Sequence, residues 1–234
     1  MEVQIAVSKI NKYATSESGD TLEVVERPGG GLSIVLADGQ QSGRSAKKVS
    51  NLVVRKVISL LAEGVRDGAA ARAASDALFH DKGGRVQATL NILSVDLTSK
   101  TLVITRNNPA PIIYLQDGAI GTIGEESNPV GLYRHTRPSI QELDLTLSLG
   151  VLAFTDGLVQ AGDRLGKRMD IPAAFQQYNS IPQASAQDVA NALLDQALSL
   201  DQGRPGDDIS LVVLRVEAGQ SDSIRRLSLS LPLP

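Results

Sequence analysis

Cysteine is absent from the 234-residue sequence. This absence excludes disulfide bonds, thiolate nucleophiles and sulfur-ligated zinc or iron–sulfur sites, and it suits a reducing cytoplasm. The sequence also has no uninterrupted apolar run near the ~18 residues that a transmembrane helix needs. Its N-terminus has neither a long apolar segment nor a small-residue cleavage site. We therefore expect a soluble, unexported, cytoplasmic protein that does not enter a membrane.

The sequence has little net charge and no run of basic residues. Its formal net charge is -3, whereas nucleic-acid-binding proteins usually carry a basic stripe or arm. Nucleic acid is therefore not an expected partner, and proteins or small molecules are. Hydrophobic residues make up 42% of the chain, which is enough for one sizeable core, although the length also permits two small domains. We expect one domain.

The first part of the sequence predicts a β-hairpin followed by two helices. Residues 22–28 and 31–37 are rich in β-branched and apolar residues and are joined by a glycine-rich turn, as in a hairpin. Apolar residues then recur at helical spacing over 46–61, up to a stop at Gly64. An alanine-rich segment over 69–79 indicates a second helix.

The rest of the chain returns to strand patterns and ends with a helix and a strand. Between residues 85 and 159 lie five or six short β-like runs separated by turn residues, which favours an antiparallel sheet. Ser185, followed three residues later by Asp188, is typical of a helix N-terminus, and helical spacing continues to Leu200. Residues 209–216, ISLVVLRV, form the last predicted strand. Helices inserted between runs of strands indicate an α+β layered domain.

Four aspartates share a sequence context: each stands beside a β-like run and next to a glycine or another acid. They are Asp20 in SGD, Asp38 in ADG, Asp156 in TDG and Asp207 in GDDIS. Hard divalent cations need several oxygen ligands, and carboxylates at strand ends can converge from distant parts of a chain. Two cations about 4 Å apart can activate water and neutralise charge on a phosphoryl group. The pattern therefore suggests metal-assisted hydrolysis.

Each motif also has a purely structural interpretation. Asp-Gly is among the commonest hairpin-turn dipeptides, and Asp117-Gly118, between two strand-like runs, is best read in that way. Taken alone, Asp38-Gly39 and Asp156-Gly157 favour the same turn interpretation. Asp20 fits a loop, and Asp207-Asp208 fits a cap before a strand.

The order of the whole set favours the metal site. SGD, then ADG followed by SG and a helix, then TDG, then DDIS before LVVLRV resembles the protein phosphatase 2C-like metal-dependent phosphatases. The resemblance is to their bacterial branch, which includes the sporulation stage II protein E phosphatase domain and the phosphatases of stress sigma-factor pathways. GGRVQATLNIL, RNNPAPIIYL and SNPVGLY are softer matches. The resemblance covers residues 1–216 as a phosphatase domain and leaves 217–234 as a C-terminal extension.

The resemblance implies a fold and a set of metal ligands. The fold would be a four-layer α-β-β-α sandwich, in which helices flank two antiparallel sheets and the metals lie at one end. Asp38 would bridge two Mn²⁺ or Mg²⁺ ions, and the carbonyl group of Gly39 would complete one site.

The remaining three acids would serve mainly the second ion. The resemblance assigns this role to Asp20, Asp156 and Asp207, with Asp208 as the alternative to Asp207. No histidine falls near the motifs, so the resemblance gives no histidine general acid.

The implied activity is that of a protein serine/threonine phosphatase. A water activated by two metal ions would hydrolyse phosphoserine or phosphothreonine in a bacterial regulatory protein of a stress response, such as a phosphorylated anti-sigma-factor antagonist. Gln40 and Gln41 replace the glycine and histidine that many relatives have, and Ser210 replaces the more usual threonine. Two alternatives stay open: a phosphatase-like module that binds a partner with little turnover, and a hydrolase of a small phosphorylated metabolite. The oligomeric state is not predicted.

Overall fold

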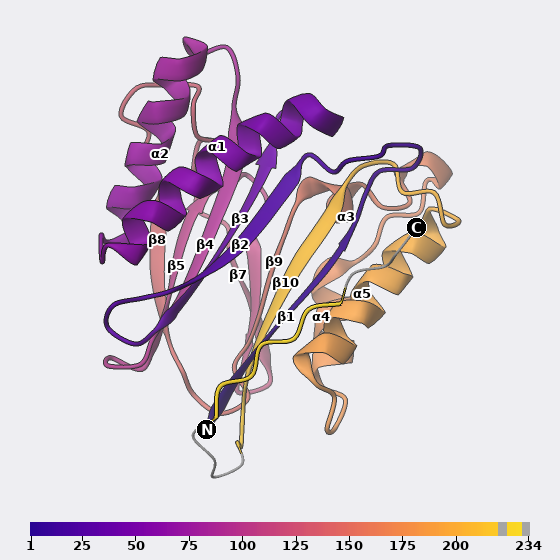
Figure 1. Cartoon of the computed structure of the whole chain (residues 1–234). Helices are drawn as coiled ribbons and strands as arrows, with labels where there is room; N and C mark the ends of the chain where they lie inside the picture. Colours follow the sequence, from indigo (N-terminus) through magenta and orange to yellow (C-terminus); the bar gives the residue numbers. More distant parts are fainter. Residues whose placement is uncertain (220–223, 231–234) are drawn as a thin grey trace.

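Two antiparallel β-sheets pack face to face, and helices cover the outer face of each sheet (Figure 1). This arrangement comes from a computed structural model that describes residues 1–219 and 224–230. The α-β-β-α fold expected from the sequence is confirmed.

The first sheet contains the first and last strands of the chain and three strands from the middle of the sequence. The spatial order is β1-β10-β9-β6-β7, and every neighbouring pair is antiparallel. Its strands are β1 (Glu2–Ile10), β6 (Ile112–Gln116), β7 (Ala119–Ile123), β9 (Gly150–Phe154) and β10 (Ile209–Glu217).

The second sheet is a meander in the order β2-β3-β4-β5-β8. Its strands are β2 (Asp20–Glu26), β3 (Leu32–Gly39), β4 (Ala88–Asp96), β5 (Thr101–Asn107) and β8 (Ser139–Asp144). Apolar side chains from the facing sides of both sheets form the central core, among them Ile34, Leu93, Val151 and Leu214.

Helices close the two outer layers. The pair α1 (Gly43–Ala62) and α2 (Asp67–Lys82) packs on the second sheet through side chains such as Val53 and Leu78. The pair α4 (Ile171–Asn179) and α5 (Ala186–Leu200) packs on the first sheet. A one-turn helix α3 (Asp156–Gln160) and a 3₁₀ turn η1 (Asp163–Leu165) connect β9 to α4.

Most predicted elements are confirmed, and two are additional. The hairpin, the two early helices and six strands between residues 85 and 159 are present, and Ser185 and Asp188 form a reciprocal capping box at the start of α5. Asp117 and Gly118 form the β6–β7 hairpin turn, with positive φ angles at both residues. The two additional elements are β1 and α4. The alternation in EVQIAV is a strand signal.

In the C-terminal extension, residues 217–234, Glu217 is the last residue of β10, and residues 218, 219 and 224–230 have neither helix nor strand. The side chains of residues 224–230 are exposed. The rest of the 220–234 tail lies outside the described residues, and the division of the chain at residue 216 stays a prediction. Within residues 1–219 and 224–230, none of the helices is long and apolar enough to cross a membrane.

Candidate metal centre

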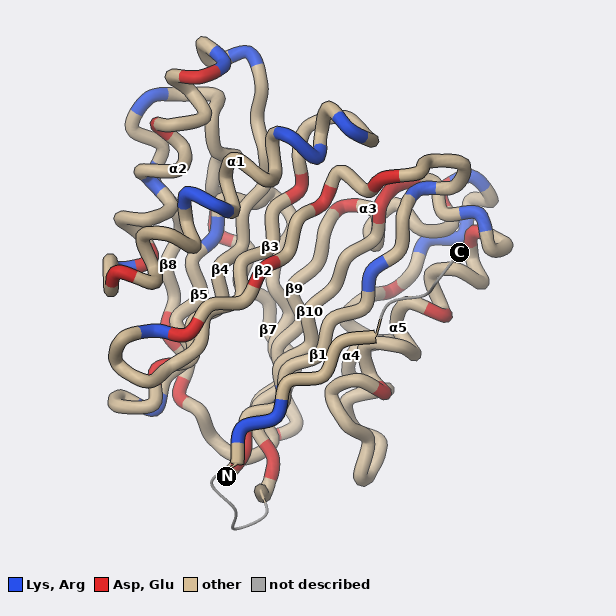
Figure 2. Tube along the Cα trace, viewed as in Figure 1, with Lys and Arg blue, Asp and Glu red and all other residues tan. Residues whose placement is uncertain are grey.

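The four predicted aspartates come together at one end of the sandwich. In the second sheet, β2 begins at Asp20 and β3 ends just after Asp38, and the antiparallel register pairs these two residues directly. In the first sheet, Asp156 follows the end of β9 and Asp207 precedes the start of β10. Figure 2 shows acidic positions gathered at this end of both sheets. Strand pairing within the second sheet and the packing of the two sheets therefore bring together residues up to 187 positions apart in the sequence (207 − 20).

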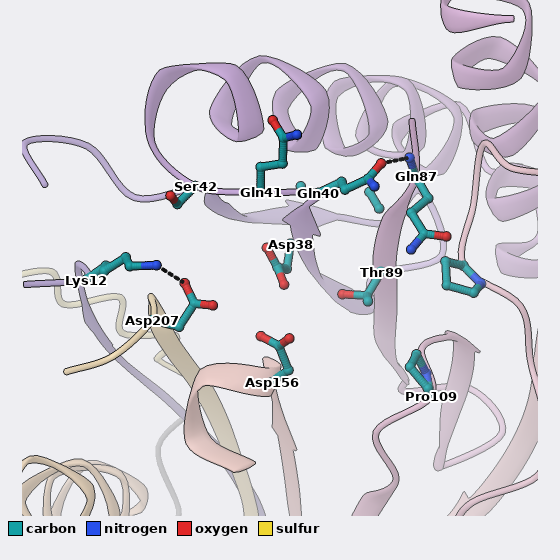
Figure 3. A pocket seen from close by; sticks show the side chains of 13 residues that line it. Lys12, Asp38, Gln40, Gln41, Ser42, Gln87, Thr89, Pro109, Asp156 and Asp207 are labelled. Atoms are coloured by element: carbon teal, nitrogen blue, oxygen red, sulfur yellow. Dashed lines mark hydrogen bonds and ion pairs between the residues drawn. The ribbon is translucent and has the colours of Figure 1, made fainter. Parts of the chain in front are cut away.

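A pocket of about 370 Å³ opens between the two sheets at this end. Asp38, Asp156 and Asp207 point toward one another across it (Figure 3), and Gly39 also lines it. The rest of the lining is mostly uncharged: Gln40, Gln41, Ser42, Gln87, Ala88, Thr89, Pro109 and Pro129. Among the described residues, Lys12 is the one basic residue in the lining.

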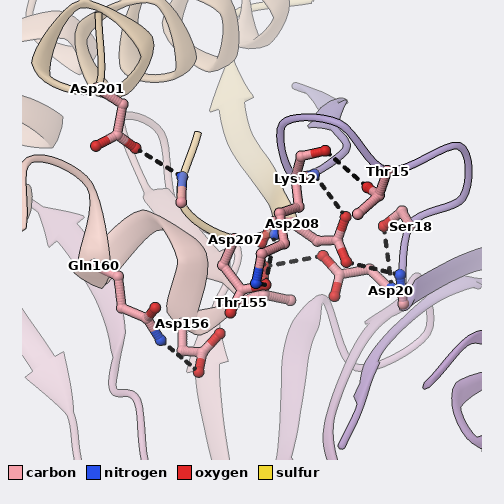
Figure 4. Close-up of polar contacts among 12 residues, drawn as sticks. Lys12, Thr15, Ser18, Asp20, Thr155, Asp156, Gln160, Asp201, Asp207 and Asp208 are labelled. Atoms are coloured by element: carbon pink, nitrogen blue, oxygen red, sulfur yellow. Dashed lines mark hydrogen bonds and ion pairs between the residues drawn. The ribbon is translucent and has the colours of Figure 1, made fainter. Parts of the chain in front are cut away.

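Asp20 lies beneath the pocket and is fully buried. Its Oδ2 atom accepts a hydrogen bond from the hydroxyl group of Ser210, at 2.6 Å. The same atom accepts one from the hydroxyl group of Thr155, at 3.1 Å (Figure 4). Its Oδ1 atom is buried and has no hydrogen-bond partner among the residues that the structure describes. Buried polar atoms are nearly always paired, so this oxygen could accept a ligand such as a metal ion.

The carboxyl groups of Asp20, Asp38 and Asp156 have raised pKa values, because they are at least partly buried close to other carboxylates. Burial, followed by the charge of Asp20 and then that of Asp156, raises the pKa of Asp38 well above its ordinary value. Burial also raises the pKa of Asp20, against the hydrogen bond from Ser210. Asp156 is exposed as a residue, but partial burial of its carboxyl group, and then the charge of Asp207, raises its pKa too. A bound cation would reverse these shifts, because it favours the ionised form.

Asp207 and Asp208 have opposite orientations. Asp207 lines the pocket, and one of its oxygens lies 3.9 Å from Nζ of Lys12. Asp208 is buried, and its carboxylate accepts hydrogen bonds from the backbone N–H groups of Lys12, at 2.9 Å, and Gly19, at 2.8 Å. Asp208 thus fixes the loop between β1 and β2, which supports the choice of Asp207 as the ligand.

We expect Asp208→Ala to destabilise the metal-free protein by about 2–4 kcal/mol, since each hydrogen bond to a charged group contributes roughly 1.5–3 kcal/mol. Asp207→Ala is the matched control and should cost less than about 1 kcal/mol, because its ion pair is partly exposed. Urea unfolding with a chelator present measures both values. Equal losses of unfolding free energy in the two variants would show that Asp208 does not stabilise the loop more than Asp207 does.

The glycines of the two Asp-Gly motifs are required by close packing. A Cβ atom on Gly39 would lie 2.1 Å from the backbone oxygen of Ala46 in α1. A Cβ atom on Gly157 would lie 2.1 Å from the backbone oxygen of Asp208. Neither glycine has a positive φ angle, and Asp38 ends a strand while Asp156 begins a helix. The hairpin-turn interpretation of these two motifs is therefore wrong.

Two lysines lie close to the backbone of the buried acid. Nζ of Lys9 and Nζ of Lys47 donate hydrogen bonds to the carbonyl oxygen of Asp20, at 2.6 and 2.7 Å. Both lysines therefore bind the backbone of Asp20, and neither donates a hydrogen bond to its carboxylate. Neither this pair nor Thr155 was predicted, because nothing in the local sequence distinguishes them from surface lysines and an ordinary strand-end threonine.

The residues fit a hard divalent cation. They supply oxygen donors only, as Mg²⁺ and Mn²⁺ prefer, and one donor is buried without a partner. In the described part of the chain, no three acidic or histidine side chains already surround one point as a ligand set, so binding would require the carboxylates that face the pocket to move closer together. His80 and His135 lie outside the pocket lining.

The chain matches a family model described as Stage II sporulation protein E (SpoIIE) over residues 28–217. Among curated proteins, Stage II sporulation protein E of Bacillus subtilis (strain 168) is 18% identical over 200 residues, which cover 86% of this chain and 24% of that protein. The chain thus spans about a quarter of the length of this relative.

Several solved structures have the same fold. The PP2C phosphatase domain of SpoIIE from Bacillus subtilis, solved with a fragment of its regulatory domain, gives a TM-score of 0.79 at 17% identity, covering 92% of this chain and 64% of that one. The Mycobacterium tuberculosis serine/threonine phosphatase PstP/Ppp gives 0.69 at 17% identity, covering 93% and 100%. RsbX in complex with magnesium gives 0.70 at 15% identity, covering 92% and 96%.

Proposed function

The chain belongs to the stage II sporulation protein E family, and we propose that it is a metal-dependent phosphatase that removes phosphate from serine or threonine residues of a protein. One observation carries the proposal: three aspartates from both sheets line a single pocket with Asp20 buried beneath it, and burial and repulsion between carboxylates raise the pKa values of Asp20, Asp38 and Asp156. An acidic pocket without cations would repel a phosphate group, whereas one that holds cations would attract it.

The proposed ligands are Asp38, with the carbonyl group of Gly39, and the side chains of Asp20, Asp156 and Asp207. When bound, two Mg²⁺ or Mn²⁺ ions lower the pKa of water and neutralise negative charge on a phosphoryl group. RsbX, which shares the fold, was solved in complex with magnesium, and this supports a hard divalent ion here.

The chain's own residues would orient the ligands and admit the substrate. Ser210 and Thr155 hold Oδ2 of Asp20, so that Oδ1 stays available. Because the ligands come from the ends of strands in both sheets, their positions depend on rigid elements rather than on loops. A pocket of about 370 Å³ admits a phosphorylated side chain and keeps a folded substrate domain outside. In the described residues no histidine lines the pocket, so water would supply the proton to the leaving serine oxygen.

We propose a phosphorylated regulatory protein, such as an anti-sigma-factor antagonist, as the substrate. Family membership supports this class of partner. The presence of all four acids favours turnover over a module that only binds its partner, because losing a ligand is the simplest route to an inactive relative. The small phosphorylated metabolite stays as the alternative substrate class.

Hydrolysis of p-nitrophenyl phosphate and of a phosphoserine peptide tests the proposal. We expect turnover of both compounds with Mn²⁺ or Mg²⁺ and none with EDTA. Activity that survives EDTA would contradict the metal requirement. Turnover of small phosphate esters, with none on phosphoserine or phosphothreonine peptides, would favour the metabolite hydrolase.

A further inference from the structure

A group of exposed basic residues lies beside the pocket on the side of the first sheet. Arg164 belongs to η1 and Lys167 to the loop that follows it, and Arg204 lies in the loop between α5 and β10. All three are exposed, and in the described part of the chain none has a carboxylate oxygen within 4.0 Å. Figure 2 shows basic positions close to α3, next to the acidic end of the sheets. We call Arg164, Lys167 and Arg204 the basic rim.

The acids of the same two segments do not neutralise the basic rim. Asp201 accepts hydrogen bonds from the backbone N–H groups of Gly162, at 2.9 Å, and Gly206, at 3.3 Å. Asp163 pairs with Arg168 through two contacts, at 2.5 and 3.1 Å. These carboxylates stabilise the loops, and the three cations of the rim remain available to a partner.

The basic rim is continuous with the pocket. The guanidinium group of Arg204 lies over the ring of Tyr13, 5.3 Å from its centroid, and the N–H group of Tyr13 donates to the carbonyl oxygen of Pro205. The next residue back along the chain, Lys12, lines the pocket. The side chain of Arg164 packs against Gly206, which directly precedes Asp207. A polypeptide that leaves the pocket on this side must therefore cross the rim.

The charge of the rim matters most when the proposed ions are present. Four ionised carboxylates and two divalent cations cancel, so the rim then dominates the field on this side. The opposite side of the pocket is lined by Gln40, Gln41 and Gln87, which carry no charge. The whole chain carries a net charge of -3, so a local cluster of unpaired cations is not an average property of its surface.

We propose that the basic rim docks an acidic segment of the phosphoprotein, next to the phosphorylated residue. The inference rests on the proposed function, because it assumes that a phosphorylated side chain enters the pocket. Charged groups around a binding site steer association and select among partners. The rim would thus select for substrates whose phosphorylated residue has Asp or Glu close by.

Two phosphoserine peptides with a fluorescent label test this surface. They share a central sequence and differ only in their flanks, which are Asp/Glu in one and Lys in the other. Binding is measured by fluorescence anisotropy with Mn²⁺ at low salt, for the wild type and for Arg164→Glu/Lys167→Glu. The matched control is Arg55→Glu/Lys56→Glu, an equal charge change at two exposed positions in the second half of α1.

We expect the wild type and the control variant to bind the acidic peptide about tenfold more tightly than the lysine peptide, and the rim variant to lose this preference. The preference should shrink at about 1 M salt, where charges are screened beyond roughly 3 Å. Equal binding of both peptides by the wild type, or an equal loss in the control variant, would overturn the docking surface.

Hydrolysis of p-nitrophenyl phosphate in the same samples reports separately on the proposed function. The wild type and the control variant should hydrolyse it at similar rates, because Arg55 and Lys56 lie in the second half of α1 and do not line the pocket. Selective peptide binding without any hydrolysis would contradict the phosphatase and leave the docking surface standing. Hydrolysis without selective peptide binding would contradict the docking surface and leave the phosphatase standing.

Discussion

Asp38→Asn is expected to reduce Mn²⁺-supported hydrolysis of p-nitrophenyl phosphate by about 1000-fold or more. Asp38 stands at the end of β3, faces Asp156 and Asp207 across the pocket and is the proposed bridge between two ions. An amide can supply one neutral oxygen but not the charge that holds two cations together. Metal-ion stabilisation of a phosphoryl transition state is worth several kcal/mol, and each 1.4 kcal/mol is a factor of ten in rate.

Two further variants make the activity measurement specific. Asp156→Asn should also lose most activity, because its carboxylate faces the same pocket. Asp117→Asn is the matched control: it changes an exposed Asp-Gly motif in the β6–β7 turn, where asparagine tolerates the positive φ angle. Retention of more than a tenth of the wild-type rate by Asp38→Asn would contradict the assignment of Asp38 as the bridging ligand.

The same Asp38→Asn variant is expected to unfold at a higher temperature than the wild type when metal is removed. Burial, and then the charge of Asp20, raises the pKa of Asp38 to about 9. At neutral pH the metal-free protein must therefore either hold a proton on this group or tolerate buried repulsion. An asparagine avoids both costs, and we expect its melting temperature at pH 8 to be roughly 5–10 °C higher.

The pH dependence of this effect has a definite sign. A carboxyl group whose pKa is raised in the folded state binds more protons there than in the unfolded state, so stability falls as pH rises. For Asp38 this fall extends from the unfolded value near 4 to about 9. Thermal unfolding from pH 5 to pH 9 in EDTA should show a decline in the wild type that is smaller in Asp38→Asn. Parallel curves of melting temperature against pH for the two proteins would show that the raised pKa of Asp38 does not cause the decline.

Mn²⁺ should then stabilise the wild type most at the alkaline end of this range and stabilise Asp38→Asn little. Ligand binding stabilises the folded state in proportion to the logarithm of ligand concentration over the dissociation constant, and deprotonated carboxylates bind metal more tightly. The melting temperature with and without Mn²⁺ at pH 6 and pH 8 measures this coupling. A larger Mn²⁺ effect at pH 6 would contradict it.

Local sequence patterns were sufficient for most of the elements. The glycine-rich hairpin, the helix over 46–61 and the capping box at Ser185 each depend on residues within a few positions of one another, so their signals are visible in one dimension. The strand β1 and the helix α4 were missed because their patterns are short, and long-range pairing and packing stabilise them. In β1, the partner strand β10 is about 200 residues away in the sequence.

The family, too, could be identified from the sequence. Four short acidic motifs in a fixed order indicated the phosphatase 2C-like branch, and the family model match over residues 28–217 confirms that resemblance. Each motif alone could be interpreted either as a metal ligand or as an ordinary turn or loop residue. Order along the chain resolved the ambiguity because unrelated turns have no reason to occur in that succession. The metal ligands themselves stay a prediction.

Tertiary packing settled what local patterns leave open. Asp207 and Asp208 are adjacent and chemically identical, and only the packing of the β1–β2 loop directs one into the pocket and the other to the N–H groups of Lys12 and Gly19. The glycine at 39 is required by the close approach of α1, which no neighbouring residue reveals. The basic rim likewise exists because two loops meet in space. Residue types and their spacing determine the elements and the kind of chemistry, whereas orientation, burial and charge balance arise from contacts between distant segments.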